Sequence, residues 1–189
     1  MKEPRPTPEE MRPLSENEAR TFLEAVRRTG ERFEALYVLA ITTGLRRGEL
    51  LGLRWEDVDL ERGRLRVGRA LVREGGRHIL GETKTRRERR QINLTPGTVS
   101  ALQAHRKKQL EGKMRLAGLH KDQGLIFASE VGTPVNPENL VKRSFKPLLK
   151  EAPAYRRYDS TIFGTRAPRC YWDEAFTPNS CRSFSDTRP

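Results

Sequence analysis

Residues 42–60 read TTGLRRGELLGLRWEDVDL, and this stretch organises the first half of the chain. Gly44 can stop a preceding apolar helix in a left-handed C-terminal turn, and a short amphipathic helix begins at Gly48. Arg46 lies between the two helices, so the spacing predicts a rigid corner that presents its guanidinium. A guanidinium offers paired donors to phosphate oxygens and stays charged at any cellular pH. Glu49 can lie beside Arg46 and hold its orientation. The alternative is a surface arginine in an ordinary helical ion pair.

A second polar segment, ETKTRRERRQ at residues 82–91, carries one lysine and four arginines within seven positions. It lies between predicted strands that end at Leu80 and resume at Gln91. Such a loop can enter a DNA groove or grip the phosphate backbone, and the ammonium of Lys84 can donate a proton to a leaving oxygen. The alternative is a solvated run of charges. The residues predicted to contact DNA through these two segments are Arg47, Thr85, Arg86, Arg87, Arg89 and Arg90.

The rest of the chain predicts a mixed, mostly α fold. Ser15 and Glu18 form a capping box that begins the first helix. Strand-like segments with a Gly75-Gly76 turn predict a small three-stranded antiparallel sheet over residues 57–94. The expected helices share apolar residues at helical spacing and cover residues 15–30, 33–44, 48–53, about 97–118, and a last stretch that begins at Pro137.

Composition limits the class of protein. The 189 residues carry a formal net charge of +12 and a sequence pI near 10.3, which favours a polyanionic partner, nucleic acid first. No apolar run approaches the roughly 18–20 residues of a membrane span, and the N-terminus lacks the apolar core of a signal peptide. Two cysteines cannot build a disulfide framework. We therefore expect a soluble, cytoplasmic, DNA-associated protein with no membrane partner and no small-molecule substrate.

These segments together resemble the catalytic domain of the tyrosine recombinases, the phage-integrase family. The similarity also includes LSENEARTFLEA at 14–25, LIFAS at 125–129 and NPENLVKRSFKPLLKEA at 136–152, in order and spacing. The resemblance implies a fold that is mixed and mostly α: an incomplete tyrosine-recombinase catalytic domain with a small three-stranded antiparallel sheet.

The resemblance also implies a chemistry. The family cuts and rejoins double-stranded DNA without a metal or nucleotide cofactor. A tyrosine attacks a backbone phosphate, two arginines stabilise charge on its oxygens, and a hairpin lysine protonates the leaving 5′-oxygen. By resemblance, Arg46 matches the first arginine, Glu49 the acidic residue that follows it, and Lys84 the hairpin lysine. The expected partners are double-stranded DNA and other recombinase protomers.

The remaining family elements do not match. The sequence has no His-x-x-Arg element for the second arginine. Tyr155, Tyr158 and Tyr171 follow Lys84, but none has the sequence context of the nucleophile, so we assign none to that role. The N-terminal DNA-clamping domain common in the family is also expected to be absent.

The composition changes sharply near Ala152. Residues 1–151 contain 21 leucines, whereas residues 152–189 contain no leucine, valine or lysine. If the gene is read one frame over from there, codon degeneracy permits a His-x-x-Arg element from residues 160–164 and a Leu-Gly-His element from 184–187. Our hypothesis is a frameshift near Glu151. We accordingly predict a linker or arm over 1–13, a partial catalytic domain over 14–151 and a non-native, disordered tail over 152–189.

The expected function is DNA integration or site-specific recombination, in a truncated chain that has lost catalytic activity. Two alternatives stay open: a non-catalytic fragment that binds duplex DNA, and a basic RNA-binding protein.

Overall fold

The computed structural model describes residues 15–82, 89–116, 118 and 120–151. The predicted arm and tail lie outside these residues. Within the described part, no helix is both long and apolar enough to cross a membrane.

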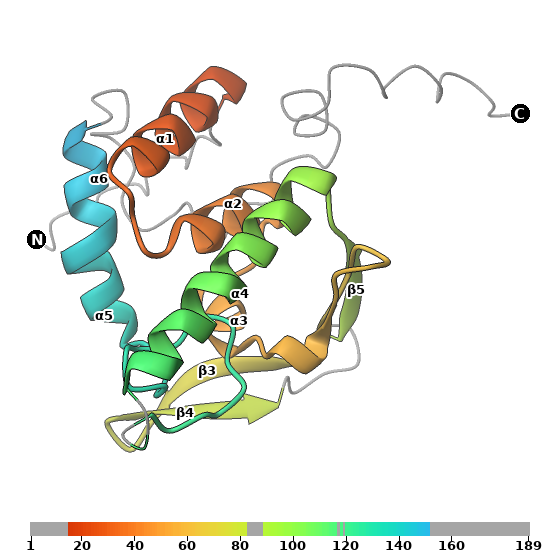
Figure 1. The fold of residues 1–189 in the computed structure, drawn as a ribbon, viewed down its shortest axis with the longest axis vertical. Coiled ribbons are helices and arrows are strands. Elements are labelled where there is room, and N and C mark those ends of the chain that lie inside the picture. The colour runs from red at the N-terminus through yellow and green to blue at the C-terminus, as the bar shows by residue number, and fades with distance from the viewer. Residues whose placement is uncertain (1–14, 83–88, 117, 119, 152–189) are drawn as a thin grey trace, which may run out of the picture.

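Three helices begin the described part of the chain (Figure 1). α1 (Glu16–Arg28) begins at the predicted capping box, in which the Glu18 amide donates to Ser15 Oγ and the Ser15 amide donates to the Glu18 carboxylate. α2 (Glu34–Thr43) is buried on nearly every side, as its apolar sequence predicted. It ends where Gly44 takes φ 63°. α3 (Arg47–Gly52) then follows after one short corner.

The sheet region is built differently from the prediction. A three-stranded antiparallel sheet is present, with the order β1-β2-β5, made by β1 (Val58–Asp59), β2 (Arg64–Val67) and β5 (Arg90–Asn93). The Gly75-Gly76 hairpin, which the sequence predicts inside that sheet, forms a separate two-stranded sheet of β3 (Arg69–Glu74) and β4 (Arg77–Glu82). The prediction was right about the small sheet and wrong about its strands, because Gly68 separates β2 from β3 and the chain leaves the first sheet there.

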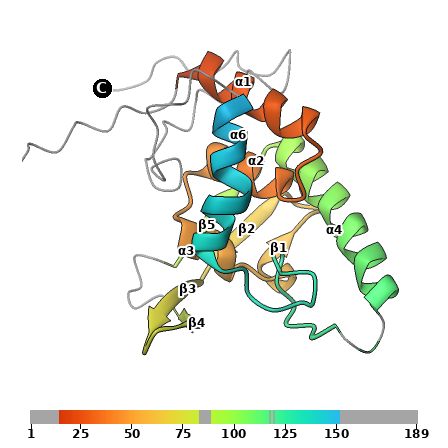
Figure 2. The same cartoon turned by 90° about the vertical axis from the view of Figure 1, so that its left-hand side faces the viewer.

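The remaining helices pack around α2. α4 (Pro96–Leu116) crosses the front of the molecule in Figure 1, close to its predicted bounds. A helical rod follows, made of α5 (Pro137–Leu140), a π-helical turn (Val141–Phe145) and α6 (Lys146–Glu151). Figure 2 shows this rod passing in front of α2 and α3, so that α2 lies between the rod and α4.

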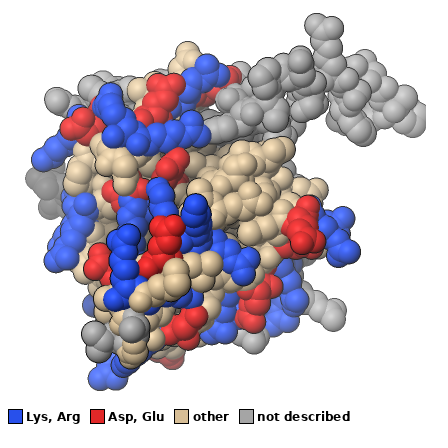
Figure 3. Space-filling view, in the orientation of Figure 1, with Lys and Arg blue, Asp and Glu red and all other residues tan. Residues whose placement is uncertain are grey.

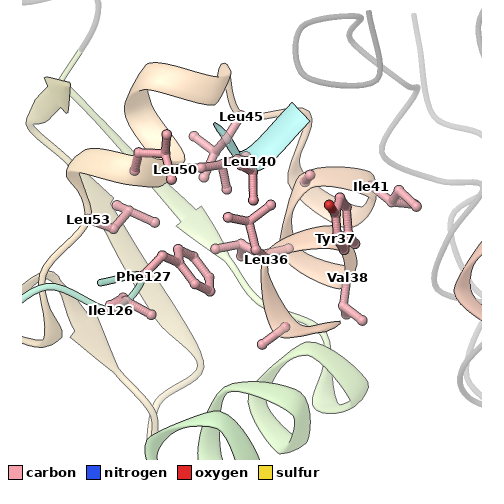
Figure 4. Packing of buried hydrophobic residues seen from close by; sticks show 14 of the residues in the cluster. Leu36, Tyr37, Val38, Ile41, Leu45, Leu50, Leu53, Ile126, Phe127 and Leu140 are labelled. Carbon is pink, nitrogen blue, oxygen red and sulfur yellow. The ribbon is translucent and has the colours of Figure 1, made fainter. Parts of the chain in front are cut away.

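One apolar core joins these elements. Figure 4 shows Leu36, Leu50, Leu53 and Phe127, from α2, α3 and two connecting segments, pointing toward one another. All four side chains are at most 1% exposed. Because α2 and α3 are both anchored in this core, the corner between them is held firmly in place.

Candidate functional site

The α2–α3 corner places Arg46 as predicted. The Gly44 amide donates to the Ala40 carbonyl at 2.9 Å, which closes α2, and the next side chain, Leu45, is fully buried. Arg46 then takes extended backbone angles (φ −67°, ψ 149°) and caps α3. Its side chain is exposed and forms no ion pair with any residue that the structure describes. The corner therefore offers an unpaired guanidinium from a fixed backbone.

Glu49 supports this corner through the main chain. The Arg46 amide donates to Glu49 Oε2 at 2.8 Å, which satisfies one of the free amides at the start of α3. The sequence predicts that Glu49 orients the Arg46 side chain, but its carboxylate instead accepts hydrogen bonds from the guanidinium of Arg90. Arg90 Nη1 and Nη2 each donate to one Glu49 oxygen at 2.9 Å.

The charge of Glu49 follows from these contacts. Burial by itself would raise the pKa of this carboxyl, which is only 3% exposed. The hydrogen bonds from Arg90 and from the Arg46 amide, with the positive charge of both arginines, outweigh burial and hold the pKa below its usual value of 4.5. Glu49 is therefore ionised at neutral pH and ties β5 to the start of α3.

Two glycines bring the β3–β4 hairpin against α3. A Cβ on Gly48 would lie 2.8 Å from the Leu71 carbonyl oxygen, and a Cβ on Gly52 would lie 2.9 Å from Ala70 Cα. Both glycines have ordinary backbone angles, so glycine is needed here because any side chain would collide with β3. The four-residue spacing puts them on one face of α3, and β3 packs directly onto that face.

The strands on either side of the predicted cationic loop both connect to α3, β4 through its partner β3 and β5 through Arg90. On one side β4 ends at Glu82, which pairs with Arg69 of β3. On the other side β5 begins at Arg90, whose guanidinium binds Glu49. Lys84, Thr85, Arg86 and Arg87 lie outside the described residues.

The other predicted DNA contacts differ in exposure. Arg89 is exposed and Arg47 is half-buried at the first turn of α3. Arg90 points inward, on the Ile92 side of β5, where Glu49 occupies its guanidinium. The structure therefore gives Arg90 a partner within the protein.

The sequence analysis missed one further set of cations. Lys142, Lys146 and Lys150 follow one another at four-residue intervals along the helical rod, and all three are exposed. None of the three forms an ion pair with a described residue. The repeated spacing in VKRSFKPLLKE was the signal that could have found them.

His105 has a structural role. It is 8% exposed, its Nε2 lies 2.8 Å from the Ile126 carbonyl, and its ring lies between Trp55 and Phe127. Because a carbonyl accepts, Nε2 carries the proton. Burial lowers the pKa of His105, so the ring is neutral at pH 7. Among the described residues, no group of three or more His, Cys, Asp or Glu side chains could hold a metal ion.

The chain belongs to the phage integrase family: the family profile, described as Phage integrase family, matches residues 12–184. The matched span continues past residue 151, so the predicted boundary there stays a prediction.

Curated relatives are similar over part of their length. The chain is 32% identical over 161 residues to a protein named "Tyrosine recombinase XerC-like" from Caldanaerobacter subterraneus subsp. tengcongensis, a match that covers 79% of this chain and 41% of the relative. It is 33% identical over 132 residues to an "Integrase" from Streptomyces ambofaciens, covering 65% of this chain and 32% of the relative. The chain thus spans less than half the length of these relatives.

A solved structure shows the same fold. The Tn1549 transposon integrase, in complex with transposon right end DNA, superposes with a TM-score of 0.63 at 21% identity, over 82% of this chain and 51% of that one. The fold is therefore that of part of a tyrosine-recombinase catalytic domain.

Proposed function

We propose that this chain takes part in site-specific DNA recombination by binding DNA, and that Arg46 and Lys84 bind one DNA phosphate between them. The observation that supports this most directly is the α2–α3 corner: an exposed guanidinium, which pairs with none of the described residues, stands on a backbone held by Gly44 and Glu49. A guanidinium held in this way can stabilise charge that develops on a phosphate oxygen without moving first.

The anchoring of the loop supports the role of Lys84. The strands before and after residues 83–88 both connect to α3, β4 through β3, which packs on Gly48 and Gly52, and β5 through Arg90, which binds Glu49. We propose that Lys84 lies close enough to the corner to bind the same phosphate, the position from which the lysine of the family protonates a leaving 5′-oxygen. Duplex DNA is the proposed partner, and no cofactor is needed for this chemistry.

The DNA contacts divide into two roles. Arg47, Thr85, Arg86, Arg87 and Arg89 are proposed to contact the phosphate backbone. Such contacts position a protein on DNA without reading its sequence. Arg90 is proposed to position the loop instead, because its guanidinium already binds Glu49. The exposed lysines of the helical rod, Lys142, Lys146 and Lys150, are proposed as further contacts to the phosphate backbone.

The chain is proposed to bind DNA without cleaving it. The printed sequence offers neither a His-x-x-Arg element nor a tyrosine in the family's context. Without the second arginine, one of the two guanidinium groups that the family directs at the phosphate oxygens is missing. We therefore expect no covalent protein–DNA adduct from a suicide substrate that traps the cleaved strand. An adduct that survives denaturant would contradict this part of the proposal.

The binding itself is tested by gel shift at several salt concentrations. Arg46→Ala should weaken duplex binding and make the slope of log K against log salt shallower by about 0.9, the value for one lost phosphate contact. Arg73→Ala is the matched control, since Arg73 is an exposed arginine near the tip of the β3–β4 hairpin. Equal effects of the two substitutions, or tighter binding to structured RNA than to duplex DNA, would count against the proposal.

A further inference from the structure

A cavity of about 370 Å³ lies at the other end of α2 from Arg46, between the C-terminal half of α4 and residues 120–130. Arg32, which lines it, comes two residues before α2 begins, whereas Arg46 comes three residues after α2 ends. Ten helical residues separate the two ends by about 15 Å. The cavity is therefore distinct from the proposed DNA site.

Gly112 opens one wall of this cavity. It lies inside α4, where glycine is a poor choice for helix stability. A Cβ at Gly112 would meet no atom within 4 Å, so close packing does not require the glycine. Lys108 lies four residues before it and Arg115 three residues after it, on the same face of α4. The missing side chain leaves open space between two cations.

The lining is strongly positive. Glu130 is the only acidic residue among the described residues that line the cavity, against four lysines and arginines. Arg32 pairs with Glu130 at 3.7 Å and donates to the Ala128 carbonyl at 2.9 Å, and Lys113 pairs with Asp122 at 2.7 Å. Lys108 and Arg115, by contrast, form no ion pair with any residue in the described part of the chain. In Figure 3, Lys and Arg side chains, with Asp and Glu side chains among them, cover the lower half of α4, while its upper half shows no Lys or Arg.

The far wall is held in place by a tight turn. Gly132 has φ 84°, and a Cβ there would collide with the Lys121 carbonyl and lie 2.6 Å from His120 Cε1. The Lys121 amide donates to the Val131 carbonyl at 2.9 Å. His120 on this wall gives the cavity ring surface, and Leu116 at the end of α4 gives it aliphatic surface.

We propose that this cavity binds a small phosphate-bearing molecule of about mononucleotide size, as a ligand separate from the DNA. Its volume falls within the roughly 300–1,000 Å³ typical of small-molecule sites. Lys108 and Arg115 lie two helical turns apart, about 10 Å along α4, so their long side chains can reach different oxygens of one polyphosphate. The ring and aliphatic walls can hold the uncharged part of such a ligand.

Calorimetric titration at constant ionic strength tests this proposal, with pyrophosphate, AMP and ATP as probes. ATP should bind more tightly than AMP, because it brings more negative charge to the two free cations. Gly112→Leu keeps every charge and fills the space, and it should weaken ATP binding at least about tenfold. Leucine is a good helix former, and circular dichroism will show that the fold is kept.

Lys108→Gln should also weaken ATP binding at least about tenfold, whereas Lys107→Gln, one residue away but outside the lining, should change it less than twofold. Equal weakening by both substitutions would show a diffuse charge effect and overturn the proposal. So would no binding of any probe, or tighter binding of a 5′-phosphorylated DNA duplex through the same Lys108. Arg46→Ala should leave ATP binding unchanged, so the two proposals fail independently.

Discussion

Replacing Gly52 by alanine tests whether close packing of α3 on the hairpin organises the site. An added Cβ would lie 2.9, 3.0 and 3.1 Å from Ala70 Cα, C and N, all three of them backbone atoms. They cannot rotate away, so α3 or β3 must shift. Overpacking of this kind costs about 1–3 kcal/mol, and alanine recovers less than about 1 kcal/mol in helix propensity at this last position of α3. We expect a net loss of about 1–2 kcal/mol in the free energy of unfolding.

Gly112→Ala is the matched control, because it makes the same change where a Cβ meets nothing within 4 Å. It should gain about 0.5–1 kcal/mol from helix propensity. Urea unfolding should therefore separate the two variants by about 1.5–3 kcal/mol, through the midpoint and not the slope. If Gly52→Ala were as stable as Gly112→Ala, the close approach of α3 and β3 would be refuted.

Three further predictions concern buried polar groups. Because the pKa of Glu49 is lowered in the folded protein, its ionised carboxylate stabilises the fold above pH 4.5, and this stabilisation is lost as the pH falls through the folded pKa. Glu49→Gln should remove this acid dependence of the urea midpoint. It should also cost about 1–3 kcal/mol at pH 7, because Arg90 loses its carboxylate partner. Burial lowers the pKa of His105, so below pH 6.5 the unfolded chain takes up the proton first and the free energy of unfolding falls. His105→Gln should make the urea midpoint less dependent on pH between pH 7 and 5. An unchanged pH dependence of the midpoint would contradict the buried neutral ring. Tyr37→Phe removes the 2.6 Å hydrogen bond to Ser144 and should lower the free energy of unfolding by about 1–2 kcal/mol, measured by thermal unfolding. The double variant with Ser144→Ala should lose less than the sum of the two single variants, because both single changes break the same hydrogen bond.

Features that depend on neighbouring residues were predictable from the sequence. The Ser15 capping box, the Gly44 stop and the exposed Arg46 each need only a few consecutive residues, because helix caps and left-handed turns are local. The apolar run at residues 33–44 likewise predicted a helix buried on all sides. The family resemblance also follows from order and spacing along the chain.

Contacts between distant segments were decided only by the tertiary structure. Glu49 and Arg90 are 41 residues apart, so the short spacing of Glu49 from Arg46 suggested the wrong side-chain partner. The strand order β1-β2-β5 is likewise non-local, since the whole β3–β4 hairpin intervenes before β5 returns to β2. Periodicity shows which face of a strand is apolar, but it does not choose the neighbouring strand. Strands β2 and β5 pair because this buries Leu65, Val67 and Ile92 in one core. The β3–β4 hairpin packs instead against α3, at Gly48 and Gly52.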